Sequence, residues 1–152
     1  MTASENVKIE RSVWIKAARS RVWRALTNLD EFSKWFGVEA VGEFAAGQRL
    51  QMTSTHPGYE GVKFFVTVET IQPEECFAWR WIPGSDAAGD PNPATTLVEL
   101  RLRDSEGGTL VTVTESGFDR VSLARRAKVL AQNEEGWKIQ MASLERYAAE
   151  KA

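Results

Sequence analysis

The sequence predicts an α+β fold in which an antiparallel sheet wraps around a long C-terminal helix. Three observations predict it. Apolar and polar residues alternate near the N-terminus and again through a long central region. Two short helical segments lie between those regions, and apolar residues recur at three- and four-residue steps near the C-terminus. The resulting order is strand, two helices, six strands and one helix, which is typical of the α+β class.

The N-terminal third is predicted to hold one strand and the two short helices. The alternation over Val7–Lys16 predicts a strand with one buried face. A helix is expected over Ser20–Asn28, capped by the hydroxyl of its first residue. Asp30 is expected to cap a second helix that ends at Gly37, because glycine commonly follows the last residue of a helix.

The central region is predicted to form six strands joined by turns. The Gly107-Gly108 pair predicts a hairpin between the last two strands. The segment Pro83–Pro93 is polar and rich in turn-forming residues, so it is expected to be a loop. The strands are expected near 38–44, 48–55, 61–72, 75–82, 94–104 and 108–117.

The final helix is predicted from about Ser122 to Glu150. A helix of that length spans roughly 40 Å, because each residue adds about 1.5 Å. Only the antiparallel sheet is long enough to cover it. A curved sheet cannot touch such a helix at every point, so we expect a cavity between them unless large side chains fill it.

Composition bounds the domain count and the class of function. A chain of 152 residues suits one domain, residues 1–152, and the net charge of −2 excludes a strongly basic nucleic-acid module. No apolar run is long enough for a membrane span, and no secretory signal is visible. Cys76 is the only cysteine and His56 the only histidine, so we expect no disulfide, no Cys/His metal site and no cofactor. A cytoplasmic location is expected.

Aromatic and aliphatic residues on the inward parity of the strands are expected to line the cavity with one stripe of the last helix. Such an apolar space with a few polar groups is the usual form of a small-molecule site. The alternative is that these side chains simply fill the core. The predicted ligand-binding residues are Trp35, Phe36, Val66, Phe77, Trp79, Trp81, Leu100, Val113, Asn133, Trp137, Gln140 and Met141.

Gly136 lies on the same helical stripe as the side-chain amides of Asn133 and Gln140, and the three residues favour a cavity over a filled core. Glycine destabilises a helix interior by about 1 kcal/mol relative to alanine, and a buried amide without partners is also unfavourable. Both are explained if this stretch lines a cavity with polar groups. The alternative is that Gly136 allows close contact between helix and sheet, with the amides capping strand ends.

Two side chains are candidates for acid–base chemistry. Glu115 shares the inward parity of Val111 and Val113, so it is expected at the end of the cavity or at its rim. His56 lies in a turn, and histidine is a common acid or base in enzymes, so it could act at the cavity mouth or simply be exposed. Arg11 is one conceivable partner for Glu115, but no catalytic pair is readable from the sequence.

Three stretches of the sequence resemble a known superfamily. They are Val22–Thr27 leading to Trp35-Phe36, Thr109–Phe118, and Asn133–Trp137. With the intervening Phe77–Trp81 they resemble the helix-grip superfamily of START, Bet v allergen and polyketide-cyclase domains, abbreviated SRPBCC. The branch that is similar to the C-terminal domain of the activator of the heat-shock-protein-90 ATPase looks nearest. The resemblance covers nearly the whole chain.

The resemblance implies a seven-stranded curved sheet around the C-terminal helix, with an apolar cavity between them. In the superfamily such cavities bind lipids, sterols, plant hormones or polyketides, and some members catalyse cyclisation. The first hypothesis is therefore binding of a small hydrophobic ligand. The alternatives are a chaperone ATPase activator-like interaction module, with a chaperone as partner, and a cyclase- or hydrolase-type enzyme using the same cavity. The chain is expected to be a monomer or a homodimer.

Overall fold

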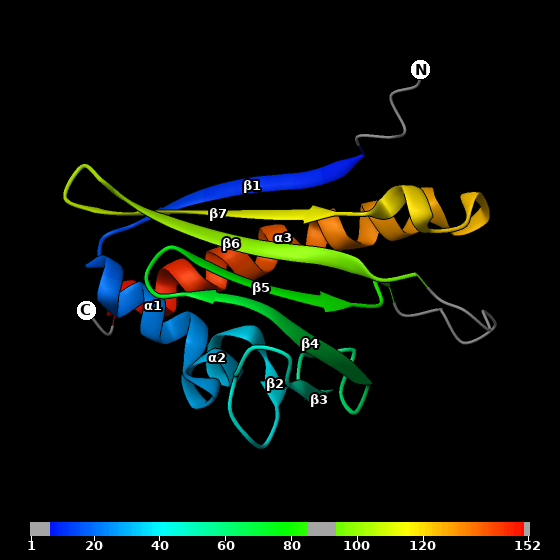
Figure 1. The fold of residues 1–152 in the computed structure, drawn as a ribbon, viewed down its shortest axis with the longest axis horizontal. Coiled ribbons are helices and arrows are strands. Elements are labelled where there is room, and N and C mark those ends of the chain that lie inside the picture. The colour runs from blue at the N-terminus through cyan, green and yellow to red at the C-terminus, as the bar shows by residue number, and fades with distance from the viewer. Residues whose placement is uncertain (1–6, 85–93, 151–152) are drawn as a thin grey trace.

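The protein forms a seven-stranded antiparallel sheet with three helices on one of its faces (Figure 1). The computed structural model describes residues 7–84 and 94–150. The strand order across the sheet is β1-β7-β6-β5-β4-β3-β2, so β1 pairs with the last strand while the others pair with their neighbours in sequence. The predicted α+β class and helix-grip architecture are confirmed. Most of the predicted loop Pro83–Pro93 lies outside the described residues.

The helices and strands follow one another in the predicted order. The strands are β1 (Lys8–Ile15), β2 (Val38–Glu39), β3 (Arg49–Ser54), β4 (Lys63–Gln72), β5 (Cys76–Trp81), β6 (Thr96–Ser105) and β7 (Gly108–Ser116). The helices are α1 (Arg19–Thr27), α2 (Leu29–Phe36) and α3 (Leu123–Glu150), with a short 3-10 turn, η3, over Phe118–Arg120.

The second strand is much shorter than predicted. We expected it over 38–44, but only Val38–Glu39 pairs with β3. The chain leaves the sheet afterwards, and Gly42 adopts a φ of 117°, a conformation that a strand cannot continue through. The sheet therefore ends in a short edge strand on this side.

The residues predicted to cap the N-termini of α1 and α2 are both wrong. Ser20 lies inside α1, which follows Ala18 and has no side-chain cap. Asn28, not Asp30, caps α2, because its side-chain oxygen accepts a 3.0 Å hydrogen bond from the backbone N–H of the third residue of the helix. Gly37 ends α2 with a φ of 80°, as predicted.

The hairpin between β6 and β7 turns one residue earlier than predicted. Its two central residues are Glu106 and Gly107, with φ values of 46° and 78°, as a type I′ turn requires. Gly108 instead begins β7, where a Cβ atom would collide with the Trp14 ring. The Trp14 indole N–H donates to the carbonyl of Ser105 at 2.8 Å, so this exposed tryptophan fastens β1 to the turn.

The core lies between the inner face of the sheet and the three helices. The predicted inward parity is confirmed, because alternate residues of β4, β6 and β7 are buried, and Phe77 and Trp79 of β5 are buried with them. In β5 the opposite parity, Cys76 and Ala78, is buried as well. Helix α3 crosses that face, lies along β1, and contacts α1 and α2 near its C-terminal end (Figure 1). The buried stripe of α3 comprises Val129, Trp137, Met141, Leu144 and Ala148. In the described parts of the chain, no helix is both long and apolar enough to cross a membrane.

Candidate functional site

A continuous cluster of aromatic rings fills the space between α2, α3 and the inner face of the sheet. Neighbouring ring centroids lie 4.6 to 6.5 Å apart, mostly edge to face, which is the favourable geometry for aromatic pairs. The ten rings of this aromatic cluster are Trp23, Phe32, Trp35, Phe36, Phe44, Phe64, Phe77, Trp79, Trp81 and Trp137.

The predicted ligand-binding residues lie together in or beside this cluster. Asn133, Gln140 and Trp81 are half-buried at its edge. Their role in binding a ligand stays a prediction. The remaining nine are buried and belong to one hydrophobic core: Trp35, Phe36, Val66, Phe77, Trp79, Leu100, Val113, Trp137 and Met141.

Glu115 is the polar centre of the cluster. Its side chain is fully buried on β7, beside Val98 of β6. The indole N–H groups of Trp81 and Trp137 each donate to its carboxylate at 2.8 Å. The Thr96 hydroxyl donates at 2.5 Å, and the Asn133 amide lies 3.0 Å from both oxygens. These groups, which come from β5, β6, β7 and α3, are called the Glu115 network below.

The Glu115 network holds a carboxylate with neutral donors. Both oxygens accept two or more hydrogen bonds, which is close to the full capacity of a carboxylate. A lone pair that could take a proton from a substrate is therefore already in use. The suggested partner Arg11 is exposed and has no contact with Glu115 among the hydrogen bonds and ion pairs of the described residues, so that pairing is wrong. This geometry suits a polar anchor better than a general base.

Gly136 lies in the middle of α3, beside this network, and faces open space. Apart from its own helix backbone and its two chain neighbours, a Cβ atom placed there would meet nothing within 4 Å. Close contact between helix and sheet therefore does not explain this glycine. One turn later, the Gln140 amide donates to the backbone carbonyl of Phe36 at 2.8 Å, and Ser143 donates to that of Trp35 at 2.7 Å. Helix α3 is thus fastened to α2 on the C-terminal side of Gly136.

His56 lies apart from Glu115. It follows β3, and its ring would lie 3.5 Å from a Cβ atom at Gly37, where α2 ends. No hydrogen bond or ion pair joins His56 to Glu115 in the described residues. The two acid–base candidates therefore do not form a pair, and their catalytic roles remain predictions.

Two surface hollows lie on the other face of the sheet. One, of about 180 Å³, opens beside Arg80 and Arg120. The other, of about 430 Å³, is a groove over Arg101, Leu110 and Thr112. Neither includes a predicted ligand-binding residue. The space expected between sheet and α3 is occupied by the rings of the aromatic cluster, so a ligand there would require those rings to move apart.

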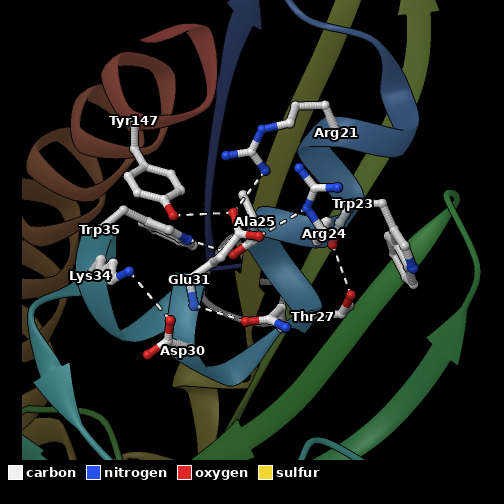
Figure 2. Close-up of polar contacts among 11 residues, drawn as sticks. Arg21, Trp23, Arg24, Ala25, Thr27, Asp30, Glu31, Lys34, Trp35 and Tyr147 are labelled. Carbon is white, nitrogen blue, oxygen red and sulfur yellow. Dashed lines mark hydrogen bonds and ion pairs between the residues drawn. The ribbon is translucent and has the colours of Figure 1, made fainter. Parts of the chain in front are cut away.

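A second polar cluster joins α3 to α1 and α2 (Figure 2). Glu31 of α2 forms ion pairs with Arg21 at 2.8 Å and Arg24 at 2.9 Å, both on α1. It also accepts a 3.1 Å hydrogen bond from the Tyr147 hydroxyl near the end of α3. Burial on its own would raise the pKa of Glu31, but the hydrogen bonds from Arg21, Tyr147 and Arg24 and the positive charge of Arg21 outweigh it and lower that pKa.

The lowered pKa of Glu31 predicts a loss of stability in acid. A carboxyl group whose pKa is lower in the folded state stabilises the fold above its unfolded pKa, here the usual 4.5. That contribution is lost as the pH falls through the folded-state pKa. We expect the difference in unfolding free energy between wild type and Glu31→Gln to shrink from neutral pH to about pH 3. Urea unfolding across this range measures it, and a constant difference would contradict the prediction.

Sequence reasoning missed two partners in these clusters. Thr96 lies on the same inward parity as Val98, so the alternation of β6 contained the signal for its contact with Glu115. The contact of Glu31 with Tyr147 joins residues more than a hundred positions apart, and no periodicity in the sequence connects them. Three His, Cys, Asp or Glu side chains placed to hold a metal ion are not found among the described residues.

Comparison with solved structures supports the fold. A protein of Mesorhizobium loti, MLL2253, has 18% identity and a TM-score of 0.76, with 96% of this chain and 99% of that chain covered. The Aha1 dimer from Colwellia psychrerythraea has 20% identity and a TM-score of 0.69, with 91% and 93% covered. CalU16 from Micromonospora echinospora has 20% identity and a TM-score of 0.68, with 97% and 80% covered.

A match at the level of sequence shows which protein family the chain belongs to. No curated protein sequence matches this chain. The family described as "Activator of Hsp90 ATPase homolog 1-like protein" matches residues 16–149, which is most of the chain and includes the Glu115 network and all but the last residue of α3. The resemblance predicted from the sequence is confirmed: the chain belongs to the family of activator of Hsp90 ATPase homolog 1-like proteins, within the SRPBCC superfamily.

Proposed function

We propose that this protein binds a small apolar molecule between α3 and the inner face of the sheet, within the aromatic cluster. The observation that carries the proposal is the presence of a glycine, Gly136, in the interior of α3 where it faces open space. It destabilises the middle of α3 by about 1 kcal/mol relative to alanine. It does so at a position where an added Cβ atom would meet nothing within 4 Å beyond its own helix backbone and its two chain neighbours. An opening kept clear beside the cluster explains this choice of residue.

The cluster has the chemistry that such a ligand needs. Transfer of apolar surface from water contributes about 25 cal/mol per Å² before the costs of binding. The rings are held by edge-to-face contacts, each worth only about 0.5–1.5 kcal/mol beyond burial, so a ligand that makes similar contacts can replace some of them. The Glu115 network fixes Trp81 and Trp137 by their N–H groups and leaves their apolar surfaces for packing.

Closing the proposed opening tests this function. We expect Gly136→Leu to weaken binding of apolar probes at least about tenfold, because the new side chain would occupy the ligand's path. Ala131→Leu is the matched control, because that residue lies on an exposed part of the same helix. A panel of aromatic and aliphatic compounds would be titrated and read by tryptophan fluorescence and thermal shift. If no compound binds, or if both variants behave alike, the proposal is wrong.

A second candidate function is interaction with another protein. Apolar side chains are exposed on and beside the β3–β4 hairpin, namely Tyr59, Val62 and Phe65. The family description names an Hsp90 ATPase activator, and one similar structure is a dimer. This candidate predicts that the protein stimulates the ATPase of the chaperone from its own host. The triple variant Tyr59→Ser, Val62→Ser and Phe65→Ser should lose the stimulation and still fold, because all three side chains are exposed. No stimulation by the wild-type protein would eliminate this candidate.

A further inference from the structure

The indole N–H of Trp79 is a buried hydrogen-bond donor without a partner. The side chain of Trp79 is 1% exposed, and its N–H has no acceptor in the described structure. Four other tryptophans donate their N–H groups. Trp14 and Trp35 donate to backbone carbonyls, and Trp81 and Trp137 donate to Glu115. Trp79 therefore differs from Trp35 and Trp137, the other two buried tryptophans of this core, whose N–H groups are paired.

The surroundings of Trp79 offer little that could accept this hydrogen bond. On the sheet its neighbours across β4 and β6 are Val68 and Val98. Rings of the aromatic cluster lie around it, with centroids at 5.8 Å for Phe32 and 6.3 Å for Trp137. A buried donor without a partner destabilises a protein by about 1–3 kcal/mol. The folded protein therefore has an unmet hydrogen bond inside the proposed binding site.

The ring contacts place this donor close to the proposed opening. The centroid of the Trp79 ring lies 6.3 Å from the ring centroids of both Trp137 and Phe36. Trp137 follows Gly136 in α3, and the backbone of Phe36 is held by Gln140, one turn further along. A molecule that enters beside Gly136 and separates these rings would reach the indole of Trp79.

We infer that the ligand is an uncharged apolar molecule that carries a hydrogen-bond acceptor, such as a ketone oxygen, and that this oxygen accepts from the Trp79 N–H. This inference rests on the proposed function. An anionic ligand is disfavoured because the Glu115 carboxylate lies in the same cluster. A cationic ligand would have to displace donors that already occupy both carboxylate oxygens.

Matched pairs of compounds test the inference. Each pair consists of a ketone and a separate hydrocarbon of similar shape. The pairs are acetophenone and α-methylstyrene, benzophenone and diphenylmethane, and fluorenone and fluorene. Affinities for wild type and Trp79→Phe would be measured by calorimetric titration. Phenylalanine keeps an aromatic ring and removes the N–H. The preference for a ketone over its hydrocarbon is expected to be about 5- to 100-fold greater in wild type than in the variant.

Trp14→Phe is the matched control. It also removes an indole N–H, but one that lies outside the aromatic cluster and is already paired with the Ser105 carbonyl at 2.8 Å. We expect it to leave the ketone preference unchanged. A second measurement covers the case in which Trp79→Phe does not fold. In wild-type protein with isotope-labelled tryptophan, the indole N–H signal that shifts on adding a ketone, and not its hydrocarbon, should belong to Trp79.

The outcomes separate the inference from the proposed function. If ketones and hydrocarbons bind and Trp79→Phe leaves their ratio unchanged, the inference is wrong while the binding function stands. The same conclusion follows if no indole N–H signal distinguishes the two compounds of a pair. If no compound of any pair binds to wild type, both the inference and the proposed function are wrong.

Discussion

Replacing Glu115 with alanine is expected to lower the free energy of unfolding by about 3–5 kcal/mol. The carboxylate is fully buried and accepts hydrogen bonds from four side chains. Its removal leaves two indoles, an amide and a hydroxyl without their acceptor. Thr96 and Trp137 are fully buried, so their donors cannot recover bonds with water unless the core opens, and each adds to the loss of stability. For a chain of this size we expect the melting temperature to fall by roughly 6–20 °C.

The comparison variants make this expectation specific. Glu115→Gln keeps the shape of the side chain and one accepting oxygen, so its loss should be smaller than that of alanine. Glu134→Ala is the control, since that glutamate is exposed on α3 beside Asn133. Chemical unfolding monitored by tryptophan fluorescence and circular dichroism measures all three. A loss below about 1 kcal/mol for Glu115→Ala would show that the Glu115 network is not a stabilising centre.

The architecture could be predicted from the sequence because it depends on repeated local signals. Alternation along the strands placed Phe77, Trp79 and Trp81 on one face, and the structure places them there. The same parity identified Glu115 as inward-facing, and it is fully buried. Elements whose ends depend on single residues were predicted less well. The caps of α1 and α2 and the length of β2 depend on local competition between neighbouring turn-forming residues, which periodicity does not resolve.

The polar contacts could not be predicted for a different reason. The Glu115 network draws its donors from β5, β6 and α3, and a register fixed in three dimensions brings them together. Parity can show that Glu115 points inward, but not which donors meet it. Conversely, the unpaired N–H of Trp79 is visible only once every neighbour is placed. The sequence could therefore indicate an aromatic site but not its hydrogen bonding.

The polar cluster around Glu31 provides a test with two arginines that pair with the same carboxylate but differ strongly in burial. Arg21 and Arg24 both pair with Glu31, at 2.8 and 2.9 Å, but their side chains are 9% and 60% exposed. A pair that is shielded from water is strongly destabilised when one partner is lost, whereas an exposed pair contributes little. Arg21 also lies over the ring of Tyr147, at 5.4 Å from its centroid, and so connects α1 to the end of α3.

We expect Arg21→Met to lower the unfolding free energy by about 2–3 kcal/mol and Arg24→Met by less than about 1 kcal/mol. Methionine keeps an apolar stem of similar length, so the comparison isolates the charged group. Because Tyr147 shares Glu31 with Arg21, the loss should reach the C-terminal turns of α3, where amide hydrogen exchange should become faster in Arg21→Met than in Arg24→Met. Equal losses in the two variants would mean that burial does not govern the strength of these pairs. Faster exchange confined to α1 would mean that the cluster does not hold α3 against the helices that close this end of the sheet.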